Sequence, residues 1–448
     1  MIIDTQQLSY ETAKLRMPFK FGAAIMTSMT IPTVKLSLKD GGNEVVGVGA
    51  MPLGNAWSFP GVPYEKSLEA MIRIVDETAA GITELEISEN PFEASFALRD
   101  LAFMAGAEIS EEMFGDSNFI PDLCKLVCYS AFDIALFDAW GKLHGENTFR
   151  LLQDSEGDFS EWLGDGFSDY ALASVLKETP VARLAIFHVV GGLDPLTPAE
   201  ITKPVGDGLP EDLQSWIKRD GLTNFKVKMS GVDPEWDFQR IVAVDKVCLE
   251  AVRAKHGRDP VYSLDLNEQC PSGTMLLELL RRYEREVPDI LARIEFIEQP
   301  TKRDFSEGRE DGLHEANKIK PIVLDEGLVD FESLNRALEL GYNGVCLKAC
   351  KGIGFSVLVA AAAKERGLYV CVQDLTCPGI SFVASSSLAA WVGVDGLEAN
   401  ARQYCPQANA VGLERMPQVF ELRNGAIHPG HGATNSLGEI GLSINALI

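Results

Sequence analysis

The residues of this chain that could carry out chemistry are charged side chains at the ends of short apolar runs, such as NFKVK, VYSLD and IEFIE. Seven residues share this position: Lys226, Lys228, Asp265, Glu298, Asp325, Lys348 and Glu398. A divalent cation takes oxygen ligands, and lysines can carry protons. Carboxylates flanked by lysines therefore suit a cation together with a pair of proton carriers.

The spacing of these runs predicts the elements that would bring the charges together. Each interval fits one or two strand-plus-helix repeats; in the first, Pro234 suits the first turn of a helix and Gly257 suits its end. Eight strands are expected, at 181–192, 223–230, 261–267, 293–299, 321–327, 343–350, 369–376 and 395–402. Repeated units of this kind form a parallel α/β barrel, in which residues at the strand C-termini converge on one site.

The N-terminal part of the chain has a different pattern. Residues 1 to about 50 are predicted as strands, with a hairpin turn at Gly41 and Gly42. Three helices are expected after them, near 64–80, 92–107 and 123–145. Strands followed by a group of helices indicate an α+β unit. The acidic segment from Ser155 to Pro180 is expected to be a long connection.

Strand alternation predicts which side chains share a face. Lys226 and Lys228 lie two residues apart, so both face the same side of their strand. Mutual repulsion and burial would lower the pKa of such a lysine and make it a usable base. Glu326 should point away from Asp325 and pair with a lysine, and Lys351, past the end of its strand, is expected in solvent.

Composition limits the partners of the protein. The chain has 448 residues, 46% hydrophobic, with a formal net charge of -25. The length suits two domains, and the charge would be repelled by nucleic acid and anionic membranes, so we expect neither as a partner. The start lacks a basic segment leading into an apolar run, and the nine cysteines include no Cys-x-x-Cys pair. We therefore expect a cytoplasmic protein with reduced thiols.

Five short motifs in order, KVK, DLN, IEQP, LDEG and LKACKGIG, resemble those of the enolase superfamily, as does the helix FDIALFDAWGKLHGENTFRLL that precedes them. The resemblance is to muconate-lactonizing enzymes, dipeptide epimerases and mandelate racemase-like members. It implies a (β/α)7β-type modified TIM barrel at 181–412, behind an α+β capping domain at 1–150. It also implies a C-terminal tail, 413–448, that returns to the capping domain.

The resemblance assigns roles to the charged residues. It implies that Asp265, Glu298 and Asp325 hold Mg²⁺. It implies that Lys228 carries a proton, that Lys226 supports its charge state, and that Lys348 approaches the substrate from the opposite face. The strand at 369–376 has no histidine. That departure argues against the His-Asp dyad of the mandelate-racemase branch and for a pair of lysines.

Substrate-binding residues are expected at the eighth strand and in the N-terminal loops. Dipeptide epimerases have Asp-x-Asp where this chain has Glu398, Ala399 and Asn400, so an unmodified dipeptide is disfavoured. Two alternatives stay open for Arg402 and the following Gln403, which either bind a distal substrate group or form structural contacts. Trp57 and Phe59 are candidates for a wall of the site, and the segment from Phe19 to Thr30 for a flap over it.

The expected function is abstraction of the proton α to a carboxylate through an ene-diolate, with Mg²⁺ as cofactor. Racemisation or epimerisation of a small carboxylic acid is the expected outcome. A lyase, such as an acid-sugar dehydratase or a succinylbenzoate-type synthase, is the first alternative. A catalytically silent barrel that binds an acid is the second. Relatives of this kind often form homo-oligomers, which is also the expectation here.

Overall fold

The computed structural model describes residues 1–21, 24–305 and 311–429. The chain begins with an antiparallel sheet of four strands in the order β3-β2-β1-β4. Their bounds are β1 Ile2–Phe21, β2 Ala24–Asp40, β3 Asn43–Ala50 and β4 Leu85–Glu86. Asp40 pairs with Asn43 across the turn, so the hairpin predicted at Gly41 and Gly42 is confirmed.

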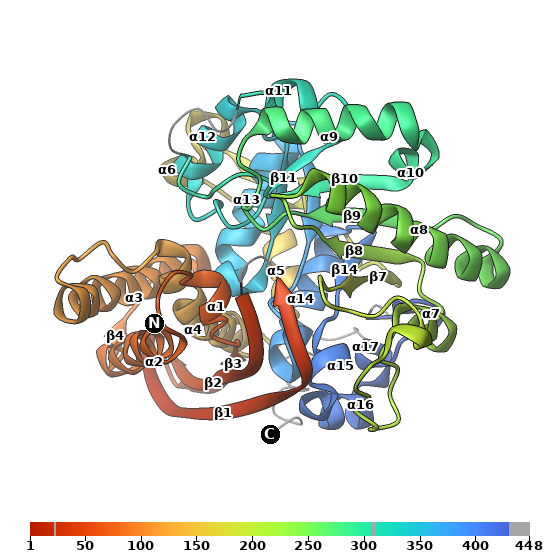
Figure 1. The fold of residues 1–448 in the computed structure, drawn as a ribbon. Helices are drawn as coiled ribbons and strands as arrows, with labels where there is room; N and C mark the ends of the chain where they lie inside the picture. The colour runs from red at the N-terminus through yellow and green to blue at the C-terminus, as the bar shows by residue number, and fades with distance from the viewer. Residues whose placement is uncertain (22–23, 306–310, 430–448) are drawn as a thin grey trace.

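Three long helices pack beside this sheet (Figure 1). They are α2 Tyr64–Gly81, α3 Pro91–Phe114 and α4 Asp122–His144. All three were predicted, but α3 runs beyond the expected end near 107, until the left-handed Gly115 stops it. Helix α4 is buried from Leu123 to Gly141, because it lies between β3 and the barrel helix α13, Ile353–Glu365. A helix that is apolar all round must be covered all round.

Two glycines of β3 let α4 approach the sheet closely. A Cβ on Gly47 would lie 2.0 Å from the carbonyl oxygen of Ala135, and one on Gly49 would lie 2.0 Å from that of Ala131. Because backbone atoms cannot give way as flexible side chains do, these two positions fix the distance between the sheet and the helix.

All eight predicted barrel strands are present. They are β7 Leu184–Val190, β8 Asn224–Lys228, β9 Val261–Asp265, β10 Ile294–Glu298, β11 Ile322–Leu324, β12 Gly344–Leu347, β13 Tyr369–Val372 and β14 Gly396–Glu398. They pair in parallel in the order β13-β12-β11-β10-β9-β8-β7-β14. This curled parallel sheet confirms the predicted fold class, an α/β barrel with an antiparallel N-terminal sheet beside it.

Helices cover the outside of the barrel sheet (Figure 1). The longer ones are α7 Leu213–Asp220, α8 Pro234–His256, α9 Gly273–Glu286, α10 Pro288–Arg293, α12 Phe331–Leu340, α13 and α14 Gly379–Val392. Helix α8 begins at Pro234, with the Asp233 side chain accepting from the Trp236 amide, and ends before the left-handed Gly257. Both predicted boundary residues are thus confirmed.

Short elements connect these layers. They are α1 Asn55–Ser58, α5 Thr148–Gln153, β5 Glu156–Gly157, α6 Ser160–Leu163, β6 Tyr170–Ala171, α11 Leu313–Ala316, α15 Ala401–Tyr404, α16 Ala410–Arg415, α17 Pro417–Phe420 and β15 Ala426–Ile427. Strand β15 pairs antiparallel with β7, so the described part of the tail contacts the barrel sheet. The remainder of the expected tail, residues 430–448, lies outside the described residues.

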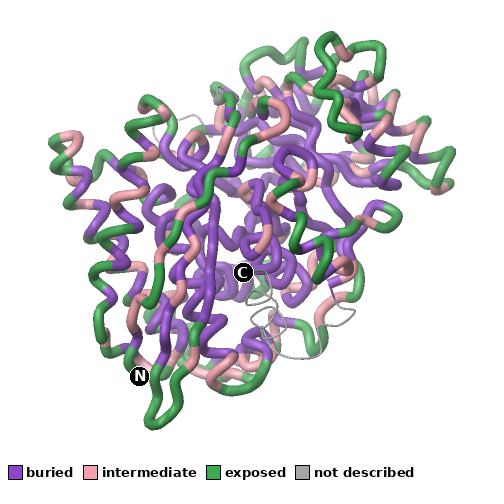
Figure 2. The backbone as a smooth tube through the Cα atoms, turned by 90° about the horizontal axis from the view of Figure 1, so that it is seen from below, coloured by how far each residue is buried: buried purple, intermediate pink, exposed green. Residues whose placement is uncertain are grey.

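The buried residues run continuously from the N-terminal sheet through α4 into the barrel (Figure 2). Within the described ranges, no helix combines the length and apolar character needed to cross a membrane.

Gly49→Ala is expected to lower the free energy of unfolding by about 1–3 kcal/mol, because the new methyl group overpacks the contact between β3 and α4. Gly42→Ala is the control, since a Cβ there meets nothing within 4 Å. Urea unfolding followed by circular dichroism measures both. Equal stability of the two variants would contradict the close contact.

Candidate active site

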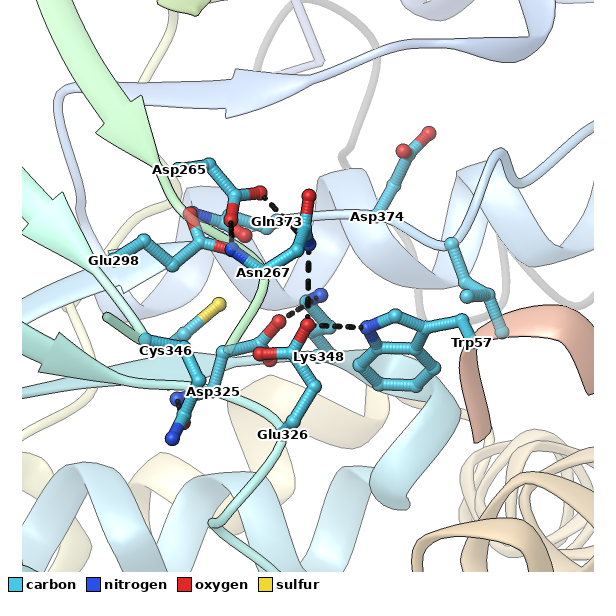
Figure 3. A network of polar contacts seen from close by, with 12 residues as sticks. Trp57, Asp265, Asn267, Glu298, Asp325, Glu326, Cys346, Lys348, Gln373 and Asp374 are labelled. Atoms are coloured by element: carbon cyan, nitrogen blue, oxygen red, sulfur yellow. Dashed lines mark hydrogen bonds and ion pairs between the residues drawn. The ribbon is translucent and has the colours of Figure 1, made fainter. Parts of the chain in front are cut away.

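Sheet register aligns the charged residues at the C-terminal end of the barrel. Lys228 is paired with Asp265 on the next strand, and Asp265 with Glu298 on the strand after that. Asp325 follows directly after β11. The side chains of Asp265, Glu298 and Asp325 are fully buried, and Figure 3 shows them pointing toward one another. The predicted convergence of the three carboxylates is therefore present in the fold.

Lys226 lies at the centre of the acidic residues. Its Nζ donates to Glu298 and to Glu398, each at 2.7 Å, and lies 3.0 Å from Asp265 Oδ2. It also donates to Gln373 Oε1 at 2.8 Å. This ammonium is the shared counter-charge of three buried carboxylates.

The expectation of a lowered pKa for Lys226 is wrong. Burial alone would lower the pKa of this lysine, but the charges of Asp265, Glu298 and Glu398 outweigh burial and raise it well above its ordinary value. Three carboxylates within 3.0 Å of the ammonium favour its charged form.

Lys228 and Lys348 approach the carboxylates from different sides of the barrel. Lys228 donates to Asp265, and Lys348 donates to Asp325 at 2.6 Å. Three strands, β9 to β11, separate β8 from β12, which is half the circuit of an eight-stranded barrel. Both lysines line one small cavity of about 40 Å³ at this end of the barrel.

Lys351 is buried, not solvated as expected. Its Nζ donates to the backbone carbonyl of Asp325 at 2.5 Å and lies 3.2 Å from Asp325 Oδ1. The short helical turn at Ala349–Lys351 brings the side chain back toward β11. Asp325 therefore has two ammonium partners. Burial would raise the pKa of this acid, but Lys348 and Lys351 lower it below its usual range.

A second polar group lies beside Asp325. Glu326 accepts from Trp57 Nε1 at 2.9 Å and from Asn267 Nδ2 at 3.2 Å, so its partners are an indole and an amide instead of the expected lysine. Burial, together with the charge of Asp325, raises the pKa of Glu326 to about 7. The ammonium of Lys348 lies 4.3 Å from the centre of the Trp57 ring, which places this aromatic residue at the site as expected (Figure 3).

The sequence analysis missed three side chains of this network, Asn267, Gln373 and Asp374, and also Thr376, which lines the cavity. Asn267 lies two residues after Asp265, and its backbone N–H donates to Asp265 Oδ1 at 2.8 Å. Gln373 bridges Lys226 and Glu298. A signal was available, because Gln373 follows β13 at the same strand-end position that drew attention to the charged residues.

The two residues expected to bind substrate lie in the same cavity. Asn400 Nδ2 donates to Glu398 Oε2 at 2.7 Å, while Glu398 Oε1 faces Lys226. Both carboxylate oxygens of Glu398 are thus engaged. Nearby, Asp374 accepts from the Asn400 backbone N–H at 3.2 Å, and burial with the charge of Glu398 raises the pKa of Asp374 to about 7.

Arg402 and Gln403 make structural contacts. Arg402 donates to Asp220 at 2.6 Å and contacts the Nδ1 of His188, and Gln403 donates to the backbone carbonyl of Val189 at 3.0 Å. Of the two alternatives left open by the sequence, these contacts support the structural one.

The expected flap is part of the hairpin formed by β1 and β2. Phe19, Met26 and Met29 line the cavity, and the Phe19 ring stacks on Tyr404 with ring centres 4.3 Å apart. Residues 22 and 23, which also belong to the expected flap, lie outside the described residues. Apolar side chains from the N-terminal sheet thus form one wall of the charged cavity.

A larger cavity, of about 520 Å³, lies at the opposite end of the barrel, where β10, β13 and β14 begin. Its lining includes Glu295, Tyr369 and Asp395, and Lys226 lines its inner end. Barrel enzymes carry their catalytic residues at the strand C-termini. The smaller cavity, which contains the charged residues, is therefore the candidate active site.

The donor set of the smaller cavity fits Mg²⁺ by its chemistry. Asp265, Glu298 and Asp325 supply hard oxygen ligands from three successive strands. Burial, together with the charge of Asp265, raises the pKa of Glu298 well above its ordinary value, which marks an excess of negative charge. Across the described ranges, no three acidic, histidine or cysteine side chains are arranged to hold a metal ion, and the ammonium groups of the lysines pair with these carboxylates instead.

The segment 208–437 matches the family model described as Enolase C-terminal domain-like. It is just over half of the chain and contains the charged strand-end residues described above. The chain belongs to this family. Membership of the enolase superfamily, inferred from five short motifs, is thereby confirmed. None of the curated proteins compared with the chain matches it.

Solved structures of enolase-superfamily enzymes share this fold. An N-succinyl Arg/Lys racemase from Bacillus cereus is 19% identical, with 89% of this chain and 87% of that chain covered and a TM-score of 0.60. A dipeptide epimerase from Enterococcus faecalis, complexed with Mg and L-Leu-L-Tyr, is 17% identical, with 90% and 92% covered and a TM-score of 0.60. A muconate lactonizing enzyme from Pseudomonas fluorescens, complexed with muconolactone, is 18% identical, with 89% and 88% covered and a TM-score of 0.58. At these identities the likeness shows the fold alone.

Lys226→Met is expected to lower the free energy of unfolding in metal-free buffer by about 3–5 kcal/mol, because it leaves buried carboxylates without their shared cation. Urea unfolding measures the change. The control, Lys318→Met, removes an exposed partner of Glu315 and should leave stability nearly unchanged. A Lys226→Met variant as stable as the control would show that the ammonium is not needed to hold the acids together.

Proposed function

We propose that this protein is a Mg²⁺-dependent enzyme that removes the proton α to a carboxylate and returns it, so that a small carboxylic acid is racemised or epimerised. The observation that carries the proposal is the presence of Lys228 and Lys348 on opposite sides of one cavity that also contains three buried carboxylates. An acid bound between the two lysines would present one face of its α-carbon to each.

The role of each lysine follows from its position. One removes the α-proton from its own face of the substrate, which gives a planar ene-diolate. The other donates a proton to the opposite face, which inverts the carbon. Lys226, enclosed by Glu298, Glu398 and Gln373, is held away from such a role and serves as a fixed positive charge.

Asp265, Glu298 and Asp325 are the proposed Mg²⁺ ligands. When bound, the ion supplies positive charge that stabilises the negative charge developing on the substrate carboxylate. Two solved structures of the same fold, both of dipeptide epimerases, are complexed with Mg, which supports this choice of ion.

The ion pair between Lys348 and Asp325 affects whether Lys348 can act as a base. Burial lowers the pKa of Lys348, and the charge of Asp325 raises it, so that the lysine stays protonated while the two are paired. A cation on Asp325 would compete for the same oxygens and leave burial as the main influence on the pKa of Lys348. The pKa of Lys348 would then fall, which favours the neutral amine that a base requires.

The eighth strand supports a substrate without a free ammonium group. Glu398 already bonds to Lys226 and Asn400, so a substrate ammonium would find its oxygens occupied. An unpaired buried charge is costly. An N-acylated or hydroxylated acid suits the amide of Asn400 better, because an amide both donates and accepts.

A lyase is the second candidate, and one observation favours it. The ammonium of Lys348 lies over the Trp57 ring, a contact that stabilises its charged form. If Lys348 remains a cation throughout turnover, Lys228 alone acts as base, and loss of a leaving group replaces inversion.

Exchange of the α-proton in D₂O with Mg²⁺ separates these candidates. For a racemase, Lys228→Ala and Lys348→Ala should each abolish inversion, and each variant should still exchange only the enantiomer that faces its surviving lysine. Lys318→Ala is a matched control outside the site. Each variant is incubated with a library of N-acylated, hydroxylated and unmodified acids. Mass spectrometry then measures the incorporated deuterium.

Equal exchange of both enantiomers by either variant would rule out opposed bases. Exchange that survives in Lys348→Ala alone, accompanied by elimination products with the unsubstituted protein, would favour the lyase. No exchange with any acid in the presence of Mg²⁺ would contradict the proposed function as a whole.

A further inference from the structure

The short helical turn that follows Lys348 is held in place through its backbone. The Lys348 carbonyl accepts from the Lys351 N–H at 2.9 Å and from Ser356 Oγ, in the first turn of α13, at 3.1 Å. Lys351 ends the turn, and its Nζ donates to the backbone carbonyl of Asp325 beside the neighbouring strand β11. The position of the Lys348 ammonium therefore depends on where α13 begins.

Helix α13 is capped by a residue from outside the barrel. Its own N-cap residue is Gly352, which has no side chain that could accept from the first N–H groups. Asp133, in the middle of α4, supplies the acceptor, because its Oδ2 accepts from the Ile353 N–H. Its Oδ1 accepts from Ser95 Oγ at 2.6 Å and from the Tyr129 hydroxyl at 2.7 Å. A carboxylate at this end also complements the helix dipole.

The contact around this carboxylate is tightly packed. Asp133, Ser95 and Tyr129 are all buried. Gly352 has a φ of +101°, and a Cβ there would lie 2.8 Å from the Tyr129 ring. A Cβ on Gly354 would lie 2.9 Å from Ser95 Oγ. The start of α13 thus lies directly against α4 and α3, with the carboxylate as its hydrogen-bonding partner.

A second buried aspartate on the same helix provides a comparison. Asp138 Oδ2 accepts from the Val48 N–H at 2.8 Å and pairs with Lys142 at 2.8 Å. This residue joins α4 to β3, on the side of the N-terminal sheet. Both aspartates are fully buried and bind a backbone N–H of another element, but only the bond of Asp133 ends beside the turn that follows Lys348.

We propose that Asp133 is a positioning residue for Lys348: by capping α13 it fixes the turn from which the lysine reaches one face of the substrate. The inference rests on the proposed function, in which Lys348 and Lys228 act on opposite faces of the α-carbon. Asp133 acts through the Ile353 N–H and takes no part in proton transfer itself. Lys228 comes from β8, on the other side of the barrel, so its position does not depend on the start of α13.

The test compares α-deuteration of the two enantiomers of one N-acetyl amino acid in D₂O with Mg²⁺. Lys228→Ala and Lys348→Ala first assign each enantiomer to its lysine. Asp133→Ala should then lower kcat at least about tenfold for the enantiomer that faces Lys348 and at most about twofold for the other, since a misplacement of about 1 Å can cost about 10²-fold. KM should change little. Asp138→Ala is the matched control and should affect both enantiomers equally.

A conservative substitution should rescue the effect. Asp133→Asn keeps an oxygen that accepts from the Ile353 N–H, and its NH₂ group can donate to the hydroxyls of Ser95 and Tyr129. We therefore expect the ratio of the two enantiomers to return most of the way to that of the unsubstituted protein.

Ser356→Ala serves if Asp133→Ala folds poorly. It removes the hydroxyl that donates to the Lys348 carbonyl, and it should shift the enantiomer ratio in the same direction. Ser386→Ala is its matched control, because Ser386 Oγ donates to the Val383 carbonyl within α14, also at 3.1 Å.

Amide hydrogen exchange measures the cap without any substrate. Asp133→Ala should speed exchange in peptides that cover residues 348–356 by at least about fivefold, since a helix that loses its cap opens more readily at its first turn. Asp138→Ala should speed exchange at residues 43–50 instead.

The outcomes separate the two claims. If acids exchange but Asp133→Ala lowers both enantiomers equally, as the Asp138 control does, the positioning role is overturned while the proposed reaction stands. Unchanged amide exchange at residues 348–356 would overturn it as well. If no acid exchanges with the unsubstituted protein, the proposed function fails, and the role of Asp133 in it fails too.

Discussion

An ammonium group surrounded by buried carboxylates holds the functional end of this barrel together. Lys226 bonds to Glu298 and Glu398 and lies within ion-pair distance of Asp265, all of them removed from solvent. Taking each charge out of water costs several kcal/mol, and only close pairing with further hydrogen bonds offsets that cost. Gln373 supplies such bonds by contacting both Lys226 and Glu298.

The barrel makes this pairing possible through its register. Parallel strands hold Lys228 beside Asp265 and Asp265 beside Glu298, so the backbone keeps these charged residues at the same end of the barrel. The N-terminal sheet and the segment around α1 then form a wall of the site. The close contact of β3 with α4 and the bond from Trp57 to Glu326 fix the apolar wall against the charged one. The charged residues and the apolar wall of the cavity thus come from segments far apart in the chain.

The sequence predicted the parts of this arrangement that depend on local pattern. All eight barrel strands, the hairpin at Gly41 and the boundaries of α8 follow from alternation, turn residues and helix-capping residues, which act over a few positions. The ion pairs of the lysines could not be predicted from local pattern, because their partners lie on other strands. The pKa of Lys226 rises because acids from three other strands surround it, and Lys351 is buried because a short helical turn brings it back toward Asp325. The environment of Glu326 likewise depends on how Trp57, some 270 positions earlier in the chain, meets the barrel.

We propose that Mg²⁺ takes over carboxylates that the lysines hold in its absence. A crystal structure of the protein at saturating Mg²⁺ tests it most directly. We predict one ion with oxygen atoms of Asp265, Glu298 and Asp325 at about 2.0–2.2 Å, and with the ammonium groups of Lys228 and Lys348 no longer bonded to those oxygens. An ion bound elsewhere, or the three acids still paired with the lysines at saturating Mg²⁺, would contradict it.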